Sequence, residues 1–287
     1  MKGFRLAIIL GLSLLGTAPL GATDDRDNDK PYLALGDSVA FGFMPMPGFE
    51  AVNASNFVGY PDFVGRALGL TTVNAACPGE ASASFSDASA PDNGCRAYRT
   101  QLPLHVPFDG TQADFAVEFV KANPRTRLVT IQVGANDLIL LAQRCTEVGL
   151  PPEICLVNAP LTLATLEQNI LAAIVDLRAA GYRRPIVIVN YFPLDFNDAQ
   201  TTVLTQALNA ALADAAHRGG AILADTFRSF TRVIAATPTA FGSACRAGLL
   251  KANPSNPLAC DVHPSQSGQR LIAEAVAASV RKANDDH

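Results

Sequence analysis

Short apolar runs alternate with longer amphipathic segments along most of this sequence, and this alternation constrains the fold more than any other feature. The runs at 31–35, 127–133 and 185–190 are almost continuously apolar or β-branched. Runs of this kind are typical of parallel strands buried on both faces. Because helix-like segments separate the runs, the sequence predicts an α/β fold with three layers, α/β/α, around a mostly parallel central sheet.

The other predicted elements keep the same rhythm. Strands are predicted at 71–76 and 221–225, and helices at 60–70, 111–123, 163–182, 198–217 and 266–282. Two segments, 77–110 and 143–161, show the period of neither a strand nor a helix. Loops of this length inside a domain are usually functional or disordered. No internal repeat divides the chain, so we expect a single domain over residues 31–287.

The first 22 residues have the pattern of a secretory signal peptide. Lys2 and Arg5 precede a short apolar run at 6–16, and small residues follow the run. This run is shorter than the roughly 20 apolar residues that a membrane-spanning helix needs. We therefore expect a cleaved signal peptide over 1–22, an acidic linker over 23–30 and no stable membrane insertion afterwards. An uncleaved membrane anchor is the alternative interpretation.

All six cysteines follow the predicted signal peptide, and an even number in an exported chain indicates disulfides. We expect pairs between sequence neighbours: Cys77 with Cys95, Cys145 with Cys155, and Cys245 with Cys260. The sequence has no Cys-x-x-Cys or His-x-x-x-His spacing, so the cysteines do not indicate a metal site. Together with the signal peptide, the disulfides predict a secreted protein, either extracellular or periplasmic.

Charge and missing motifs exclude several function classes. The formal net charge of −4 argues against nucleic acid as a partner. The sequence contains no Gly-x-Gly-x-x-Gly, P-loop or His-Glu-x-x-His motif. The Gly-x-Ser-x-Gly pentapeptide of classical α/β-hydrolases is also missing, because "GDSVA" has Ala40 at its last position.

Four short polar blocks lie at the ends of predicted strands or just before a predicted helix. Ser38, Gly79 and Asn136 each follow a strand, and His263 precedes the last helix. Among the four histidines, only His263 has a nearby carboxylate within such a block. Taken alone, each block also fits a turn or a helix cap. In open α/β sheets, however, active sites form at the carboxyl ends of the strands.

The four blocks occur in the order Gly-Asp-Ser, a strand-end glycine, Gly-x-Asn-Asp and Asp-Val-His-Pro. This ordered set resembles the blocks of the SGNH hydrolases, the GDSL lipase/esterase family. The resemblance covers about residues 31–283. The cysteine-rich loops look like those of its secreted bacterial lipase/esterase branches. The resemblance implies the flavodoxin-like SGNH fold and a carboxylic ester hydrolase without a cofactor or metal. An ester, small or lipid, would be its substrate.

The resemblance also assigns roles to residues. It implies that Ser38 is the nucleophile and His263 the general base. It further implies an oxyanion hole built from the backbone N–H groups of Ser38 and Gly79 and the side chain of Asn136. These roles agree with the chemistry, because a serine hydroxyl needs an adjacent base and the oxyanion needs preorganised hydrogen-bond donors.

The acid that orients His263 departs from the commonest pattern of the family, in which an aspartate lies three residues before the histidine. Cys260 occupies that position here, and Asp261 lies two residues before His263. Pro264 favours an extended conformation for His263, in which residues i and i+2 point to the same side. We therefore predict that Asp261 orients His263. The alternatives are a backbone carbonyl, with Asp261 capping the turn, or Asp225.

The segment after Ser38 predicts part of the substrate site. Flexible methionines and aromatic rings suit irregular apolar ligands. We expect four such residues to contact the substrate: Phe41, Phe43, Met44 and Met46. This composition favours lipid or fatty-acyl esters, although a loop that packs its own apolar side chains is an alternative. A carbohydrate O-acetylesterase and a non-catalytic secreted binding module remain the competing functions.

Overall fold

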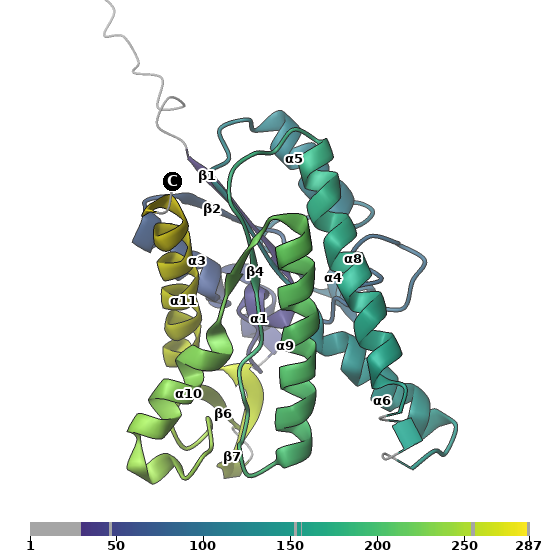
Figure 1. Cartoon of the computed structure of the whole chain (residues 1–287), viewed down its shortest axis with the longest axis vertical. Coiled ribbons are helices and arrows are strands. Elements are labelled where there is room, and N and C mark those ends of the chain that lie inside the picture. Colours follow the sequence, from purple (N-terminus) through teal and green to yellow (C-terminus); the bar gives the residue numbers. More distant parts are fainter. Residues whose placement is uncertain (1–29, 46–47, 152–153, 156, 254–255, 286–287) are drawn as a thin grey trace, which may run out of the picture.

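A computed structural model describes residues 30–45, 48–151, 154–155, 157–253 and 256–285 (Figure 1). The predicted signal peptide lies outside the described residues, and so do the linker up to residue 29 and Met46. Within the described part of the chain, no helix combines the length and the apolar character that crossing a membrane requires.

Five parallel strands form the central sheet in the order β2-β1-β3-β4-β5. They are β1 (Pro31–Gly36), β2 (Thr71–Asn74), β3 (Leu128–Gln132), β4 (Ile186–Val189) and β5 (Ile222–Ala224). All five were predicted within two residues at each end, and the predicted parallel α/β fold is confirmed. The chain first adds β2 on one side of β1 and then β3 on the other. The switch in strand order therefore lies between β1 and β3, where ligands of such sheets usually bind.

Helices cover both faces of the sheet, which gives the three predicted layers (Figure 1). One face carries α5 (Gln112–Ala122), α8 (Ala159–Ala179) and α9 (Ala199–Gly219), and the other carries α3 (Tyr60–Leu68), α10 (Thr226–Ala236) and α11 (Gln266–Asp285). In α8 the buried side chains recur every three or four residues, as in Leu163, Leu166 and Ile170. This spacing places them on one stripe that faces the core.

Several elements lie in parts of the chain for which the sequence predicts no helix or strand. These are the short helices α1 (Ser38–Phe41), α2 (Gly48–Ala51) and α4 (Cys95–Gln101), the 3₁₀ helices Ala54–Asn56 and Pro238–Ala240, the helices α6 (Ala135–Glu147) and α10, and the antiparallel pair β6 (Leu250–Asn253) and β7 (Asn256–Pro264). In α6 only Asn136, Asp137 and Cys145 are buried. The leucines of α6 therefore do not form the stripe towards the core by which a helix is usually recognised.

The six cysteines form the three disulfides that the sequence predicts: Cys77–Cys95, Cys145–Cys155 and Cys245–Cys260. The first joins the turn after β2 to α4, and the second joins the end of α6 to the segment before α8. The third joins the loop before β6 to β7. Each disulfide thus pins a segment at or near the carboxyl edge of the sheet.

Candidate active site

Ser38 begins α1 directly after β1, at the carboxyl edge of the sheet. Asp37 caps this helix, and its Oδ1 accepts a hydrogen bond of 2.8 Å from the backbone N–H of Val39. Gly36 has a φ of +149°, and a Cβ there would lie 2.4 Å from the carbonyl oxygen of Gln132 in β3. Only glycine therefore lets β1 end this close to β3, and this places Ser38 beside the switch in strand order.

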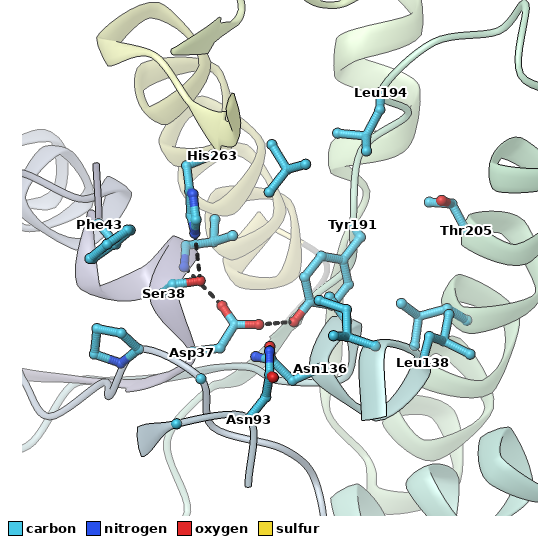
Figure 2. Close-up of a pocket in the computed structure, with 18 of the residues that line it drawn as sticks. Asp37, Ser38, Phe43, Asn93, Asn136, Leu138, Tyr191, Leu194, Thr205 and His263 are labelled. Carbon is cyan, nitrogen blue, oxygen red and sulfur yellow. Dashed lines mark hydrogen bonds between the residues drawn. The ribbon is translucent and has the colours of Figure 1, made fainter. Parts of the chain in front are cut away.

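His263 reaches Ser38 from β7 (Figure 2). Its Nε2 lies 2.9 Å from the Ser38 Oγ, and its Nδ1 forms a hydrogen bond with the Asp261 Oδ1. The same carboxylate oxygen accepts the backbone N–H of His263 at 2.9 Å. With its proton on Nδ1, the imidazole can accept the Ser38 hydroxyl hydrogen on Nε2. The three residues thus form a continuous line of hydrogen bonds.

The alternative carboxylate, Asp225, has a different position. It caps α10, where its Oδ1 accepts the backbone N–H of Arg228 at 3.0 Å. It also accepts a hydrogen bond of 3.3 Å from the Asn190 side chain. Among the other histidines, the Nε2 of His105 lies 2.9 Å from the carbonyl oxygen of Phe41, and His217 lies in the last turn of α9. Neither histidine lines the cavity that contains Ser38.

Gly79 lies in the tight turn that follows β2, and Asn136 binds the backbone next to this turn. Gly79 has a φ of +87°, and a Cβ there would lie 2.4 Å from the Asn93 carbonyl oxygen. Asn136, in the first turn of α6, donates from Nδ2 to the Glu80 carbonyl oxygen at 2.8 Å. A side-chain amide carries two such hydrogens, so this bond leaves one hydrogen for a ligand. Ser38, Gly79 and Asn136 all line the same cavity.

Asn93 supports this arrangement, and sequence reasoning missed it. Its Nδ2 donates to the Asn136 Oδ1 at 2.8 Å, and its backbone N–H donates to the Gly79 carbonyl oxygen at 2.8 Å. It therefore fixes which way the Asn136 amide faces (Figure 2). Asn93 lies in the aperiodic segment 77–110, where no strand end or motif distinguishes it from other loop residues.

A buried carboxyl group, that of Asp37, lies next to Ser38. The Tyr191 hydroxyl donates to the Asp37 Oδ2 at 2.5 Å, and both side chains line the cavity (Figure 2). Burial raises the pKa of Asp37 to about 7, and the hydrogen bond from Tyr191 opposes part of this shift. Burial also raises the pKa of Asp137, which accepts the Ser82 hydroxyl at 2.5 Å and the Ser82 N–H at 2.9 Å. Asp137 thereby ties α6 to the loop after β2.

The cavity over Ser38 has a volume of about 510 Å³. Most of its apolar and aromatic lining comes from these residues: Phe43, Tyr98, Leu138, Ile139, Tyr191, Phe192, Leu194, Leu208 and Val262. Most of these positions were not predicted, although Tyr191 and Phe192 directly follow the predicted strand 185–190. A search beyond the motifs, at strand ends, could have found them.

The four predicted substrate contacts have different positions. Phe43 lines the cavity, and its ring centroid lies 4.9 Å from that of His263. Phe41 is fully buried in the core, where its ring contacts that of Phe57, so it does not line the cavity. Met44 is partly buried against the core and also does not line the cavity, and Met46 lies outside the described residues.

No group of three or more His, Cys, Asp or Glu side chains in the described part of the chain is arranged to hold a metal ion. The polar groups of the site include the Ser38 hydroxyl, the His263 imidazole, two carboxyl groups and amide donors. Such a set can activate a hydroxyl nucleophile and stabilise an oxyanion.

Comparison with known proteins points to one family. The profile of the GDSL-like lipase/acylhydrolase family matches residues 34–271. Phospholipase A1 from Streptomyces albidoflavus NA297 has a similar structure, with 17% identity, 88% of this chain and 99% of that chain covered, and a TM-score of 0.56. A variant of an acetyl xylan esterase from Geobacillus stearothermophilus also has a similar structure, with 16% identity and a TM-score of 0.52. The match covers 88% of this chain and 94% of that chain. At these identities the likeness concerns the fold. No curated protein matches the chain in sequence.

Proposed function

The chain belongs to the GDSL-like lipase/acylhydrolase family of ester hydrolases, and from this premise we propose that it cleaves fatty-acyl esters through an acyl-enzyme on Ser38. One observation carries the proposal. The hydrogen-bonded line Ser38–His263–Asp261 opens into an apolar cavity that Gly79 and Asn136 also line. A nucleophile, its base and the donors for an oxyanion therefore surround one space.

In the first half of the reaction, the Ser38 Oγ attacks the ester carbonyl carbon while the His263 Nε2 takes the hydroxyl proton. The carbonyl oxygen becomes an oxyanion, which accepts hydrogen bonds from the backbone N–H groups of Ser38 and Gly79 and from the Asn136 Nδ2. Loss of one such donor typically lowers the rate by about 10²–10³. The C–O bond to the alcohol then breaks, and His263 returns the proton to the leaving oxygen.

In the second half, a water molecule attacks the acyl carbon and gives its proton to the His263 Nε2. The bond between the acyl group and the Ser38 Oγ breaks, the proton returns to Oγ, and the free acid leaves. The hydrogen bond from Nδ1 to Asp261 keeps the imidazole in the tautomer that both halves require, and the carboxylate stabilises the imidazolium that forms.

The lining of the cavity supports an apolar acyl group. Leucine, isoleucine, valine and aromatic side chains make up much of the lining of the cavity over Ser38, and burial of each methylene of a ligand among such side chains is favourable. The structural neighbours include a phospholipase A1 and an acetyl xylan esterase. The apolar lining favours an acyl group longer than acetyl. Esters of fatty acids are therefore the proposed substrates.

The test is hydrolysis of p-nitrophenyl esters with acyl chains from C2 to C16 by the wild type and Ser38→Ala. We expect the wild type to prefer acyl chains longer than acetate and Ser38→Ala to lose nearly all activity. Retained activity in Ser38→Ala would refute catalysis by Ser38. A strict preference for acetate would favour the carbohydrate O-acetylesterase, and the complete inactivity of the wild type would favour a binding module.

We further propose that residues 1–22 are removed on export and that residues 31–287 form the hydrolase domain. The three disulfides support a location outside the cytoplasm, because disulfides persist in oxidising compartments. The intact mass of protein recovered outside the cytoplasm should correspond to loss of the signal peptide, with no thiol open to alkylation. A full-length mass, or six alkylated thiols, would contradict this proposal.

A further inference from the structure

A second cavity of about 200 Å³ lies between α6 and α9. Four leucines contribute to its lining: Leu138 and Leu141 of α6, Leu150 beyond its end, and Leu204 of α9. We call this space the side chamber. Leu141 and Leu204 are only partly buried, and neither belongs to the main hydrophobic core among the described residues. The core therefore does not explain why leucines occupy these two positions.

The side chamber adjoins the cavity over Ser38 along both helices. Leu138 lines both spaces. On α6, Leu141 follows Leu138 by three positions, which places it on the same face one turn further on. On α9, Leu204 lines the side chamber, and Thr205 and Leu208 line the cavity over Ser38. Figure 2 shows Leu138 and Thr205 on the side of the cavity away from Ser38 and His263, so the side chamber extends the cavity away from the nucleophile.

A disulfide contributes to the wall of the side chamber. Cys155 lines it and is bonded to Cys145 at the end of α6. This bond ties α6 to the segment that leads into α8 and limits how far the two can separate. The chamber is thus bounded by α6, α9 and this cross-linked segment.

Because the two cavities adjoin at Leu138, we propose that the side chamber receives the distal methylenes of a long acyl chain whose carbonyl carbon lies at Ser38, and that Leu204 limits the length of the chain. The inference rests on the proposed function, because it requires an acyl group at Ser38. Burial of one methylene strengthens binding about fourfold. Each methylene that enters the chamber therefore raises kcat/KM until the chamber is filled.

The test compares Leu204→Phe with Val203→Phe. A phenylalanine at position 204 fills the side chamber, whereas Val203 is 62% exposed on the same helix and provides a matched control. The measured quantity is the ratio of kcat/KM for p-nitrophenyl palmitate to that for p-nitrophenyl butyrate. We expect this ratio to fall at least tenfold in Leu204→Phe and to stay at the wild-type value in Val203→Phe.

Both kcat/KM values in the ratio are measured on the same protein sample. A partial loss of folded enzyme lowers both values equally and does not change the ratio. If Leu204→Phe does not fold, Leu141→Phe fills the chamber from the opposite wall and should lower the same ratio. A wild-type ratio in the folded variant would overturn the inference, as would equal falls in the ratio in Leu204→Phe and Val203→Phe. If Ser38→Ala retains butyrate hydrolysis, the proposed function itself fails. If Ser38→Ala abolishes that hydrolysis and the ratio does not move, only the side chamber is refuted.

Discussion

At the scale of single residues, Asp261 and His263 lie only two positions apart in the sequence. Their side chains can contact each other because both residues belong to the extended strand β7. Residues i and i+2 of a strand point to the same side, so the Asp261 carboxylate can accept from both the ring and the backbone of His263. Local preferences sufficed to predict this contact. They did not suffice for Asn93 or Tyr191, whose contacts bridge residues 43 and 154 positions apart in the sequence.

If Asp261 orients the base, then Asp261→Asn and Asp261→Ala should lower kcat by about 10²–10⁴. The midpoint of thermal unfolding should change little, because the Asp261 side chain is 27% exposed. Both quantities can be measured on the purified variants with p-nitrophenyl butyrate as substrate. A kcat within twofold of the wild type in both variants would instead assign the orienting role to a backbone carbonyl.

Asp37 should make stability depend on pH. Burial raises its pKa from 3.8 to about 7, so the folded chain holds this proton more tightly than the unfolded chain. The stabilising contribution is therefore complete below about pH 4 and is lost as the pH rises to about 7. Asp37→Asn stays neutral and keeps an oxygen for the Val39 N–H. The difference in Tm between Asp37→Asn and the wild type should therefore become more positive from pH 4 to pH 8. A difference in Tm that does not vary with pH would contradict this assignment.

At the scale of elements, the β6–β7 ribbon positions His263, and the sequence did not predict this ribbon as a sheet. Its register is irregular, and the alternation of apolar and polar residues in β6, Leu-Lys-Ala-Asn, extends over only four positions. The ribbon depends on contacts beyond the local sequence: the disulfide Cys245–Cys260 and the hydrogen bond of 2.9 Å from the Ser265 N–H to the Leu249 carbonyl oxygen. The strands β1, β3 and β4 of the central sheet were predictable because each is a run that is buried throughout.

Removal of this disulfide should therefore affect both stability and catalysis. In Cys245→Ser/Cys260→Ser we expect the free energy of unfolding to fall by about 3 kcal/mol, as for a closed loop of this length. We also expect kcat to fall several-fold at temperatures at which the variant remains folded, because β7 carries both Asp261 and His263. Circular dichroism and initial rates on the same sample would measure both effects. An unchanged kcat would limit the disulfide to a role in stability.

At the scale of the whole molecule, the parallel sheet brings together residues that are far apart in the sequence. Ser38 follows β1, Gly79 lies in the turn after β2, and Asn136 follows β3. Because the carboxyl ends of parallel strands share one edge, the alternation of strands and helices already implied that these residues meet. The shape of the cavity was not predictable, because it depends on how α6 and α9 pack around it.

The central claim is that Ser38 forms a covalent acyl-enzyme, and a p-nitrophenyl alkylphosphonate tests it most directly. The Ser38 Oγ should displace p-nitrophenolate from phosphorus and leave a stable phosphonyl adduct. Peptide mass spectrometry should then find one adduct, on the peptide that contains Ser38, and none in Ser38→Ala. An adduct on another residue of the wild type, or equal labelling of Ser38→Ala, would contradict the account.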